Sequence, residues 1–384
     1  MAIIEHPASS LAPATASPQP LNRRAWLKQL VAAALIFPVG RAGSQPLQAI
    51  AGGSPPRWRE FLFSELGSWQ TPTAQFFLRS HLDHPQLSVA DWKLTLDGLV
   101  KQRSEFSFEE LIKLPSVTRT VTFECSGNPP GGGLISTAEW RAIPLHLLLE
   151  KAGVGAGAKE IVFEGADFGL DEEESVPLIF SRSIPLQKAL STETMLAWEM
   201  NGKPLSWEHG FPVRVVVPGY YAMSHVKWLS RIRVIDHSYK GFYMTKRYFT
   251  ARRIPGTGRF EFRAEMQMKI KSQIARPVSG EQISGASTIV TGAAWSGEGI
   301  VKRVEVSTDG GSTWTAAVLL DKPVRYAWVR WRLVWNTPAN GVYTLVCRAF
   351  DDAGGAQPEE PDNSVINRYG NNWYHRVEIK VLRT

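Results

Sequence analysis

The stretch around Cys125 carries the strongest chemical signal in the sequence. Cys125 comes just after the strand-like run 118–123, and the chain continues through Ser126-Gly127-Asn128, two prolines and the glycines 131–133. A thiol that enters a glycine-rich loop from the end of a strand can present a thiolate to a soft metal or an electrophile. A cysteine alone is weak evidence, because free cysteines are often small buried hydrophobes.

The Cys125 loop and three other segments, in the same order, resemble the sulfite oxidase family of molybdenum enzymes. The loop match runs from Phe123 to Trp140 and ends in Leu-Ile-Ser-Thr-Ala-Glu-Trp. The other matching segments are Phe77–Leu82, Leu196–Arg214 and Val216–Leu229. In the last third of the chain, 304–311 and 375–377 resemble the dimerisation domain of the same family.

The resemblance implies a molybdenum–molybdopterin cofactor with Cys125 as the sole protein ligand to the metal. A thiolate is a suitable donor for a redox metal of this kind. Arginine and lysine pair with phosphate oxygens, and histidine and aspartate can bond ring nitrogens. The family's contacts to the pterin and its phosphate fall on Phe77, Arg79, His81, Asp167, His209, Arg214, His225, Val226 and Lys227.

The family also places an arginine and a tyrosine beside the metal, and these match Arg79 and Tyr248. Arg79 can clamp an oxyanion with two parallel hydrogen bonds, and the hydroxyl of Tyr248 can donate to a developing negative charge. A further arginine of the family comes from the second domain. Arg368 is the nearest candidate for it, although the local spacing differs.

One departure from the family pattern concerns the substrate. Many sulfite oxidases continue the cysteine motif with two arginines, whereas this chain has Pro129 and Pro130. Part of the positive charge expected near an anionic substrate is therefore missing, which puts sulfite in doubt. The sequence before Arg79 also has no room for the family's heme domain, so we expect electrons to leave to a separate carrier, a periplasmic cytochrome c.

The elements that must position these residues fall into two patterns. From about residue 55 to 248, strand-like runs such as 92–96, 118–123 and 213–217 alternate with helix-like runs at 108–114 and 145–152. Ser107 and Glu110 have the spacing of a capping box at the start of the first helix. After residue 274, alternating strands at 289–294, 301–308, 327–334 and 342–350 dominate.

These patterns predict an α+β fold in which a mixed first part is followed by an immunoglobulin-like β-sandwich. The resemblance implies that the first part is a sulfite-oxidase-type molybdopterin domain and that the sandwich is the dimerisation domain. We expect a leader at 1–50, a catalytic domain at 51–255 and a sandwich at 256–384. Trp328, Trp331 and Trp335 are interpreted as packing in the sandwich. The acidic run 171–174 is interpreted as a solvated loop.

The leader resembles a twin-arginine export signal. It combines Arg23-Arg24, an apolar stretch ending near Phe37 and small residues after Val39. The alternative interpretation is an amphipathic surface helix. We expect export of the folded protein by the twin-arginine machinery to the periplasm, without a permanent membrane span, because no apolar run reaches the length of about 20 residues that a spanning helix needs.

Charge and cysteine content exclude other classes. The 384 residues carry a formal net charge of +7, of which residues 1–50 contribute +3. This modest excess, without a run of basic residues interleaved with aromatic ones, gives nucleic-acid binding little support, and it suits a small anionic substrate equally well. Cys125 and Cys347 are the two cysteines, and their different settings predict two separate thiols.

The sequence therefore predicts a dimeric periplasmic oxidoreductase that takes electrons from a small sulfur oxyanion, with sulfite as the first choice. Three alternatives stay open. One is a sulfane dehydrogenase subunit acting on protein-bound sulfur, and another is a reductase that runs oxygen-atom transfer in the opposite direction. The third is a non-catalytic partner subunit with a vestigial cofactor site.

Overall fold

The computed structural model describes residues 57–171, 176–366 and 369–383. The predicted leader, with Arg23 and Arg24, lies outside these residues, and so do Arg368 and the glutamates 172–174. Within the described ranges, no helix is long and apolar enough to cross a membrane.

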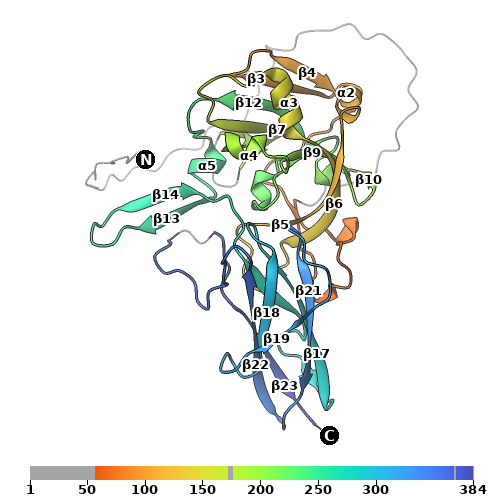
Figure 1. Ribbon diagram of the computed structural model, residues 1–384, viewed down its shortest axis with the longest axis vertical. Coiled ribbons are helices and arrows are strands. Elements are labelled where there is room, and N and C mark those ends of the chain that lie inside the picture. Colours follow the sequence, from red (N-terminus) through yellow and green to blue (C-terminus); the bar gives the residue numbers. More distant parts are fainter. Residues whose placement is uncertain (1–56, 172–175, 367–368, 384) are drawn as a thin grey trace, which may run out of the picture. The chain divides into compact units, whose positions relative to one another are not determined.

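The first half of the described chain contains two five-stranded sheets with short helices packed between and beside them (Figure 1). One sheet has the order β4-β3-β12-β7-β8, and in the other β10-β9-β6-β5 are neighbours while β11 also pairs with β9. The strands of the first sheet are β3 Lys93–Gly98, β4 Ser104–Ser107, β7 Glu160–Leu170, β8 Pro177–Pro185 and β12 Leu229–Ile235. Those of the second are β5 Val117–Glu124, β6 Ile135–Pro144, β9 Met195–Met200, β10 Lys203–Pro204 and β11 Arg214–Val216.

Short helices join these strands. The α-helices are α2 Phe108–Ile112, α3 Leu145–Ala152, α4 Leu186–Leu190 and α5 Phe242–Thr245. The 3-10 helices are η2 Phe63–Glu65, η3 Thr73–Gln75, η4 Trp207–His209 and η5 Ala222–Ser224. The predicted capping box is confirmed: the Ser107 hydroxyl accepts from the Glu110 backbone N–H, and the Glu110 carboxylate accepts from the Ser107 N–H.

The core of this half lies between the sheets. Leu94, Leu96, Ile161, Phe163 and Ile232 are fully buried there, together with apolar residues of α3. Burial of large apolar side chains stabilises such a core by about 1.5–3 kcal/mol each. The alternation of the strands puts these residues on one face, which is why the periodic pattern predicted the sheet.

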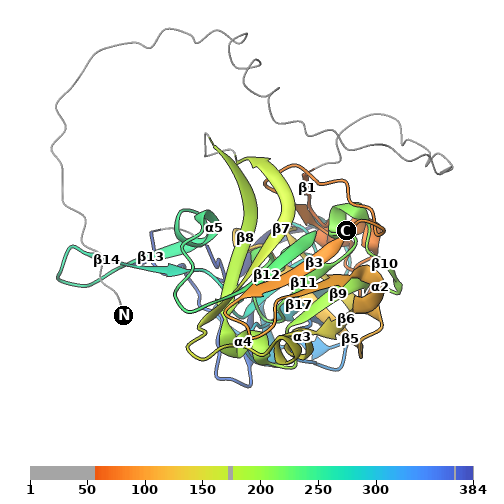
Figure 2. The same cartoon turned by 90° about the horizontal axis from the view of Figure 1, so that it is seen from above.

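Two small pairs of strands border the part of the fold where the candidate residues lie. β1 Trp58–Arg59 pairs with β2 Leu78–Arg79, and β13 Phe249–Arg253 pairs with β14 Phe260–Ala264. Seen from above, β7 and β8 run beside β12 and β3, and the β13–β14 hairpin projects to one side (Figure 2). Residue 255, where we propose the domain boundary, falls in the turn of this hairpin.

The last third of the chain is a β-sandwich, as predicted. Its first sheet has the order β15-β17-β21-β20 and its second the order β16-β23-β22-β18-β19. The bounds are β15 Lys271–Arg276, β16 Gln282–Ile283, β17 Ser287–Trp295, β18 Val301–Ser307, β19 Thr315–Ala316, β20 Val318–Leu319, β21 Val329–Asn336, β22 Gly341–Asp351 and β23 His375–Val381. The sandwich follows the mixed first half, so the predicted α+β class with a second, all-β domain is confirmed.

The tryptophans and cysteines test two details of the prediction. Trp331 and Trp335 are buried in the sandwich core, beside Cys347. Trp328 is not part of that core: it packs with Phe61 and Phe63, because the N-terminal segment crosses over this end of β21. Cys125 and Cys347 are separate free thiols, as predicted.

Candidate active site

Most of the candidate residues line one pocket, which encloses about 690 Å³ of empty space, part of it open to solvent. They come from the ends of elements: Arg79 ends β2, Cys125 follows β5, Arg214 begins β11 and Tyr248 precedes β13. The predicted residues that line the pocket are Phe77, Arg79, His81, Cys125, Asp167, His209, Arg214, His225, Lys227 and Tyr248.

Two predicted residues are not among the lining side chains. Val226 is buried in the core of the first half, and its carbonyl accepts from the Val215 N–H at 2.8 Å. Its part in the fold is to join the His225–Lys227 segment to β11. Arg368 lies outside the described residues.

Cys125 is half-buried and its backbone is fixed at both ends. Its N–H donates to the Leu134 carbonyl at 2.9 Å, and its carbonyl accepts from the Asn128 N–H at 2.9 Å. Burial raises the pKa of the Cys125 thiol, while a hydrogen bond from the Gly127 backbone and the charge of Arg79 act in the opposite direction. A bound metal would deprotonate this thiol, since metals bind the thiolate.

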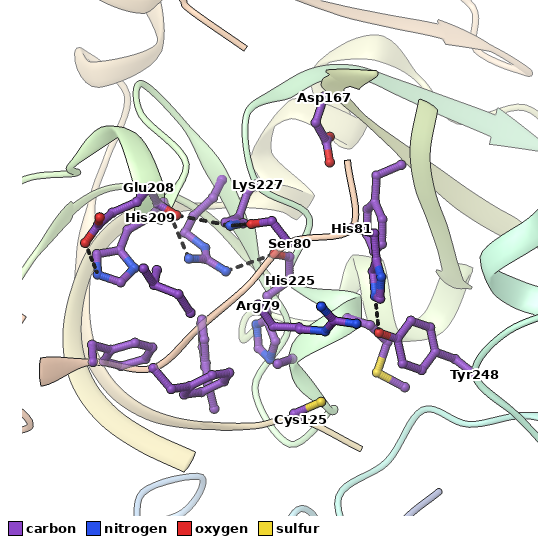
Figure 3. Close-up of a pocket in the computed structure, with 18 residues that line it drawn as sticks. Arg79, Ser80, His81, Cys125, Asp167, Glu208, His209, His225, Lys227 and Tyr248 are labelled. Carbon is purple, nitrogen blue, oxygen red and sulfur yellow. Dashed lines mark hydrogen bonds and ion pairs between the residues drawn. The ribbon is translucent and has the colours of Figure 1, made fainter. Parts of the chain in front are cut away.

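Arg79, His81 and Tyr248 form the wall beside Cys125. Figure 3 shows the Arg79 guanidinium pointing toward the pair of His81 and Tyr248, with the Cys125 sulfur on the same side of the pocket. His81 Nε2 and the Tyr248 hydroxyl are hydrogen-bonded. Burial, followed by the charges of Arg79 and Arg247, lowers the pKa of His81 to about 3, so the imidazole is neutral at pH 7.

Tyr248 is held in an uncommon backbone conformation. Its φ is 55°, in the left-handed region that bulky side chains rarely adopt, and its side chain is buried. Strain of this kind persists where the surrounding structure imposes it, often at functional sites. Burial, with the nearby Cys125 as the next contribution, raises the pKa of Tyr248, which keeps the phenol protonated.

The acidic run that begins at Asp171 differs from the prediction at its first residue. Asp171 is buried, and it accepts hydrogen bonds from the Tyr243 hydroxyl at 2.9 Å and from Arg247. Its Oδ2 also lies 3.6 Å from His81 Nδ1. The expectation of a solvated loop is therefore wrong for Asp171, because the guanidinium of Arg247, 76 residues further along the chain, compensates its charge. Glu172–Glu174 lie outside the described residues.

The opposite wall carries two buried cations. The Arg214 guanidinium donates to the carbonyls of His209 at 2.8 Å and His225 at 3.0 Å, and it lies over the ring of Phe123. Lys227 Nζ donates to Ser80 Oγ at 2.6 Å and to the Glu208 carbonyl at 3.1 Å. Burial lowers the pKa of both groups, that of Arg214 to about 9.

His209 and His225 are less available for a ligand than the sequence implied. His225 Nδ1 accepts from the Val217 N–H and its Nε2 lies 3.0 Å from the Tyr220 carbonyl, so backbone groups occupy both ring nitrogens. His209 Nε2 lies 3.3 Å from the Thr73 carbonyl. Burial lowers the pKa of His225 well below its usual value and that of His209 to about 3. Both rings are neutral at pH 7.

Two orphaned polar atoms indicate that the pocket is built for a polar ligand. Within the described part of the chain, Asp167 Oδ1 and Arg214 Nε are buried without a hydrogen-bond partner. Leaving such a group unpaired costs about 1–3 kcal/mol. Burial raises the pKa of Asp167, with Lys227 acting against it. The Asp167 carboxyl can accept hydrogen bonds from ring N–H groups, and Arg214 and Lys227 can pair with a phosphate. Together these groups fit a pterin that carries a phosphate.

The backbone near Asp167 leaves room for this arrangement. Asp167 lies in the irregular part of β7, between Glu164 and Phe168, where the register with β8 shifts. A Cβ on Gly165 would approach Asp167 Oδ1 to 2.2 Å and the Lys227 carbonyl to 3.0 Å. Glycine is therefore required at residue 165 for the carboxyl to lie beside the Lys227 segment.

Several lining residues were not predicted. Ser80 and Glu208 are neighbours of predicted residues in the matched segments, so their positions were available from the sequence. Phe180 carries no motif and reaches the pocket only because β8 pairs with β7. The remaining residues that were missed are Phe76, Leu78, Phe123, Ala222 and Met223.

Comparisons with known proteins show which families this chain is similar to. Residues 81–243 match the family model of the oxidoreductase molybdopterin binding domain, and residues 263–382 match that of the Mo-co oxidoreductase dimerisation domain. Mitochondrial sulfite oxidase of Rattus norvegicus is 34% identical over 82% of this chain and 62% of its own length. Sulfite oxidase of Gallus gallus is 34% identical over 75% of this chain and 68% of its own.

A solved structure shares most of the architecture. The sulfane dehydrogenase SoxCD from Paracoccus pantotrophus aligns with a TM-score of 0.76 and 29% identity, covering 87% of each chain. This chain spans about three fifths of the length of the mammalian relatives that it matches.

Proposed function

The chain belongs to the sulfite oxidase family of molybdopterin-dependent oxidoreductases, and from that premise we propose that it oxidises a small sulfur oxyanion, with sulfite as the first candidate. The observation that carries the proposal is the convergence of Cys125, Arg79 and Tyr248 on one pocket that also holds orphaned atoms of Asp167 and Arg214.

The residues divide into those that hold the cofactor and those that hold the substrate. Cys125 is the protein ligand to molybdenum. Lys227, with Ser80 beside it, and Arg214 pair with the phosphate of the pterin, and Asp167 accepts from the pterin's ring N–H groups. When bound, the cofactor supplies two-electron redox chemistry with oxygen-atom transfer.

Arg79 and Tyr248 act on the substrate. The guanidinium offers parallel N–H groups to an oxyanion and orients it beside the Cys125 sulfur. With His81 in the tautomer that carries its proton on Nε2, this N–H donates to the phenol oxygen. The Tyr248 O–H then points to the substrate, where it stabilises negative charge. His81 is neutral, so it adds no further positive charge beside Arg79.

The surroundings of the enzyme are part of the same proposal. The leader at 1–50 supports export by the twin-arginine machinery to the periplasm, and the match to a dimerisation domain supports a homodimer. We propose that the two electrons pass one at a time to a periplasmic cytochrome c, which is a one-electron acceptor. We propose the division into leader 1–50, catalytic domain 51–255 and dimerisation domain 256–384.

A sulfane dehydrogenase activity is the second candidate. It is favoured by the likeness to the sulfane dehydrogenase SoxCD and by Pro129 and Pro130, which replace the two arginines of many sulfite oxidases. Neither proline lines the pocket. Arg79, Arg214 and Lys227 are cations that line the pocket, and we assign Arg214 and Lys227 to the pterin phosphate. Arg79 is then the cation left for the substrate, which would suit a substrate less highly charged than sulfite.

The test is turnover of purified, molybdenum-loaded protein with reduction of cytochrome c as the readout. We expect activity with sulfite, and we expect Cys125→Ser to lose both molybdenum and turnover. Activity only with a persulfide carried on a protein would favour the second candidate, and turnover only in the direction of an oxyanion reduction would favour a reductase. Protein that contains no molybdenum after production in a host that makes the cofactor would support a non-catalytic subunit and contradict the proposal.

A further inference from the structure

Lys271, the first residue of β15 in the sandwich, makes a buried ion pair with the residue that precedes Cys125. Lys271 Nζ lies 2.7 Å from Glu124 Oε1, and both side chains are 1% exposed. The same ammonium donates to the Asn128 carbonyl at 2.8 Å. One cation of the second domain therefore holds both sides of the short turn that contains Cys125.

The Glu124 carboxylate is saturated with donors. Besides Lys271, its Oε1 accepts from Asn128 Nδ2 at 3.2 Å, and its Oε2 accepts from the indole N–H of Trp295 at 2.8 Å. Trp295 ends β17 of the sandwich and is fully buried. A buried charge is tolerated only when it is paired and hydrogen-bonded in this way, so the geometry of the cluster is strongly constrained.

The rest of the cysteine loop is also fixed from the sandwich side. Gln273 on β15 accepts from the Gly131 N–H at 3.1 Å and donates to the Gly132 carbonyl at 3.0 Å. The Gly370 N–H donates to the Ser126 carbonyl at 2.7 Å. A Cβ on Gly131 would lie 2.6 Å from His375 Nε2, so the loop packs directly on β23 as well.

We propose that Lys271 is a positioning residue for the molybdenum site: through Glu124 and Asn128, it fixes the height and direction of the Cys125 sulfur from the second domain. This inference rests on the proposed role of Cys125 as the metal ligand. Loss of the ammonium leaves the Glu124 carboxylate buried without its cation. The turn then moves to let water reach the carboxylate, and the sulfur one residue away moves with it.

The experiment compares Lys271→Met, Glu124→Gln and the double variant with the parental protein, all isolated with cofactor. Lys269→Met is the matched control, since Lys269 is exposed and lies two residues away. The readouts are molybdenum per chain, the energy of the thiolate-to-metal charge-transfer absorption, and kcat per molybdenum against KM for sulfite. A displaced sulfur lowers kcat per molybdenum by about tenfold to a hundredfold. KM stays within about twofold, because Arg79 is untouched.

The double variant restores neutrality and is expected to recover molybdenum content and most of kcat, whereas Lys269→Met behaves as the parental protein. A purely structural role of Lys271 predicts a different result: fewer molecules carry molybdenum, but each loaded molecule has the parental absorption and kcat. That result in Lys271→Met and Glu124→Gln overturns the proposal. If Lys271→Met fails to fold, Glu124→Gln, which preserves the shape of the carboxylate, decides in the same way.

A measurement without the metal separates this inference from the proposed function. In protein made without molybdenum, each single variant should lower the unfolding midpoint by about 5 °C or more, and the double variant by less than the sum of the two. Additive losses would contradict the buried ion pair. Parental protein that takes up no molybdenum refutes the proposed function, whereas loaded parental protein with unaffected variants refutes only the role of Lys271.

Discussion

The side chains of His81 and Tyr248 are joined by a hydrogen bond although 167 residues separate them in the chain. His81 follows β2 and Tyr248 precedes β13, so the bond closes one wall of the pocket between the start and the end of the first half. Asp171 lies on the far side of the His81 ring, where its carboxylate is already bound by Tyr243 and Arg247. The orientation of the phenol is therefore set by a chain of buried groups.

This arrangement predicts that the Tyr248 hydroxyl matters for rate. We expect Tyr248→Phe to lower kcat for sulfite by about tenfold to a hundredfold, because one preorganised donor to developing charge is lost. The ring and its packing remain, but His81 Nε2 loses its partner, so the unfolding midpoint should fall by only about 2–6 °C. Steady-state kinetics with cytochrome c and thermal unfolding measure the two effects. Tyr239→Phe, which removes a hydroxyl bonded to Ser181 outside the pocket, is the control. Equal kcat in both variants would contradict the role of Tyr248.

Arg79 should determine affinity for the anion. We expect Arg79→Gln to raise KM for sulfite by about tenfold to a hundredfold, which corresponds to the roughly 1.5–3 kcal/mol of a hydrogen bond to a charged group. The increase in KM with added salt should also become less steep, because a cation near the substrate is gone. KM as a function of ionic strength tests both statements, with the exposed Arg103→Gln as a control. An unchanged KM would mean that Lys227 or Arg214 holds the anion.

Stability should fall in acid. His81, His209 and His225 are buried as neutral rings, with pKa values of about 3 for the first two and well below the usual 6.5 for the third. Above pH 6.5 the rings are unprotonated in both the folded and the unfolded state, so they do not make the free energy of unfolding depend on pH. As the pH falls below 6.5, the unfolded state gains protons first. Each ring then lowers the free energy of unfolding by about 1.4 kcal/mol per pH unit, until the pH nears the folded pKa. Asp167 and Glu265, whose pKa values burial raises, oppose this trend.

Denaturant unfolding of molybdenum-free protein at pH 7, 6, 5 and 4 measures this dependence. We expect the steepest loss between pH 6 and 4, and a shallower slope in His209→Gln. A free energy of unfolding that is flat from pH 6.5 to 4 would show that these rings are accessible to protons in the folded protein.

The proposed homodimer has a candidate surface on the first sheet of the sandwich. Ile289 on β17 and Val334 on β21 are directly opposite each other and are 50% and 62% exposed. Val318 on β20 is 60% exposed on the same sheet. Apolar side chains gathered on one sheet face are typical of an interaction site. We expect Val334→Asp to raise the dissociation constant of the dimer about tenfold or more.

Sedimentation or size-exclusion measurements over a range of concentrations check this. Val342→Asp is the matched control, because Val342 is also 62% exposed but lies on β22 of the other sheet. If Val342→Asp dissociates the protein and Val334→Asp does not, the dimer uses the opposite face.

The sequence predicted those parts of the molecule that depend on local patterns. Ser107 and Glu110 form a capping box because the three-residue spacing alone permits it, and the strands of the sandwich follow from alternating apolar residues. Most of the pocket was predicted because its residues lie inside matched segments. The contacts of Asp171 with Arg247 and of Glu124 with Lys271 could not be predicted, since each joins charged residues 76 and 147 positions apart. A charged residue in a sequence does not indicate which distant residue it will pair with.

Trp328 shows the same limit for apolar residues. Its place in an alternating strand indicated burial correctly, but nothing local distinguishes packing inside the sandwich from packing against Phe61 and Phe63. The alternating pattern of a strand predicts which side chains are buried. It does not predict which residues they pack against, because that depends on how the whole chain is folded.

The contact between the cysteine loop and β15 has a consequence for biosynthesis. A nascent chain that has emerged only as far as residue 255 holds Cys125 but has neither Lys271 nor Trp295 to fix the turn around it. Domains tend to fold in the order in which they leave the ribosome, so the first half passes through a stage in which this loop is loose. The loop around Cys125 would then reach its final form only after β15 has folded against it, and a truncation that removes β15 would leave the Cys125 thiol exposed to oxidation.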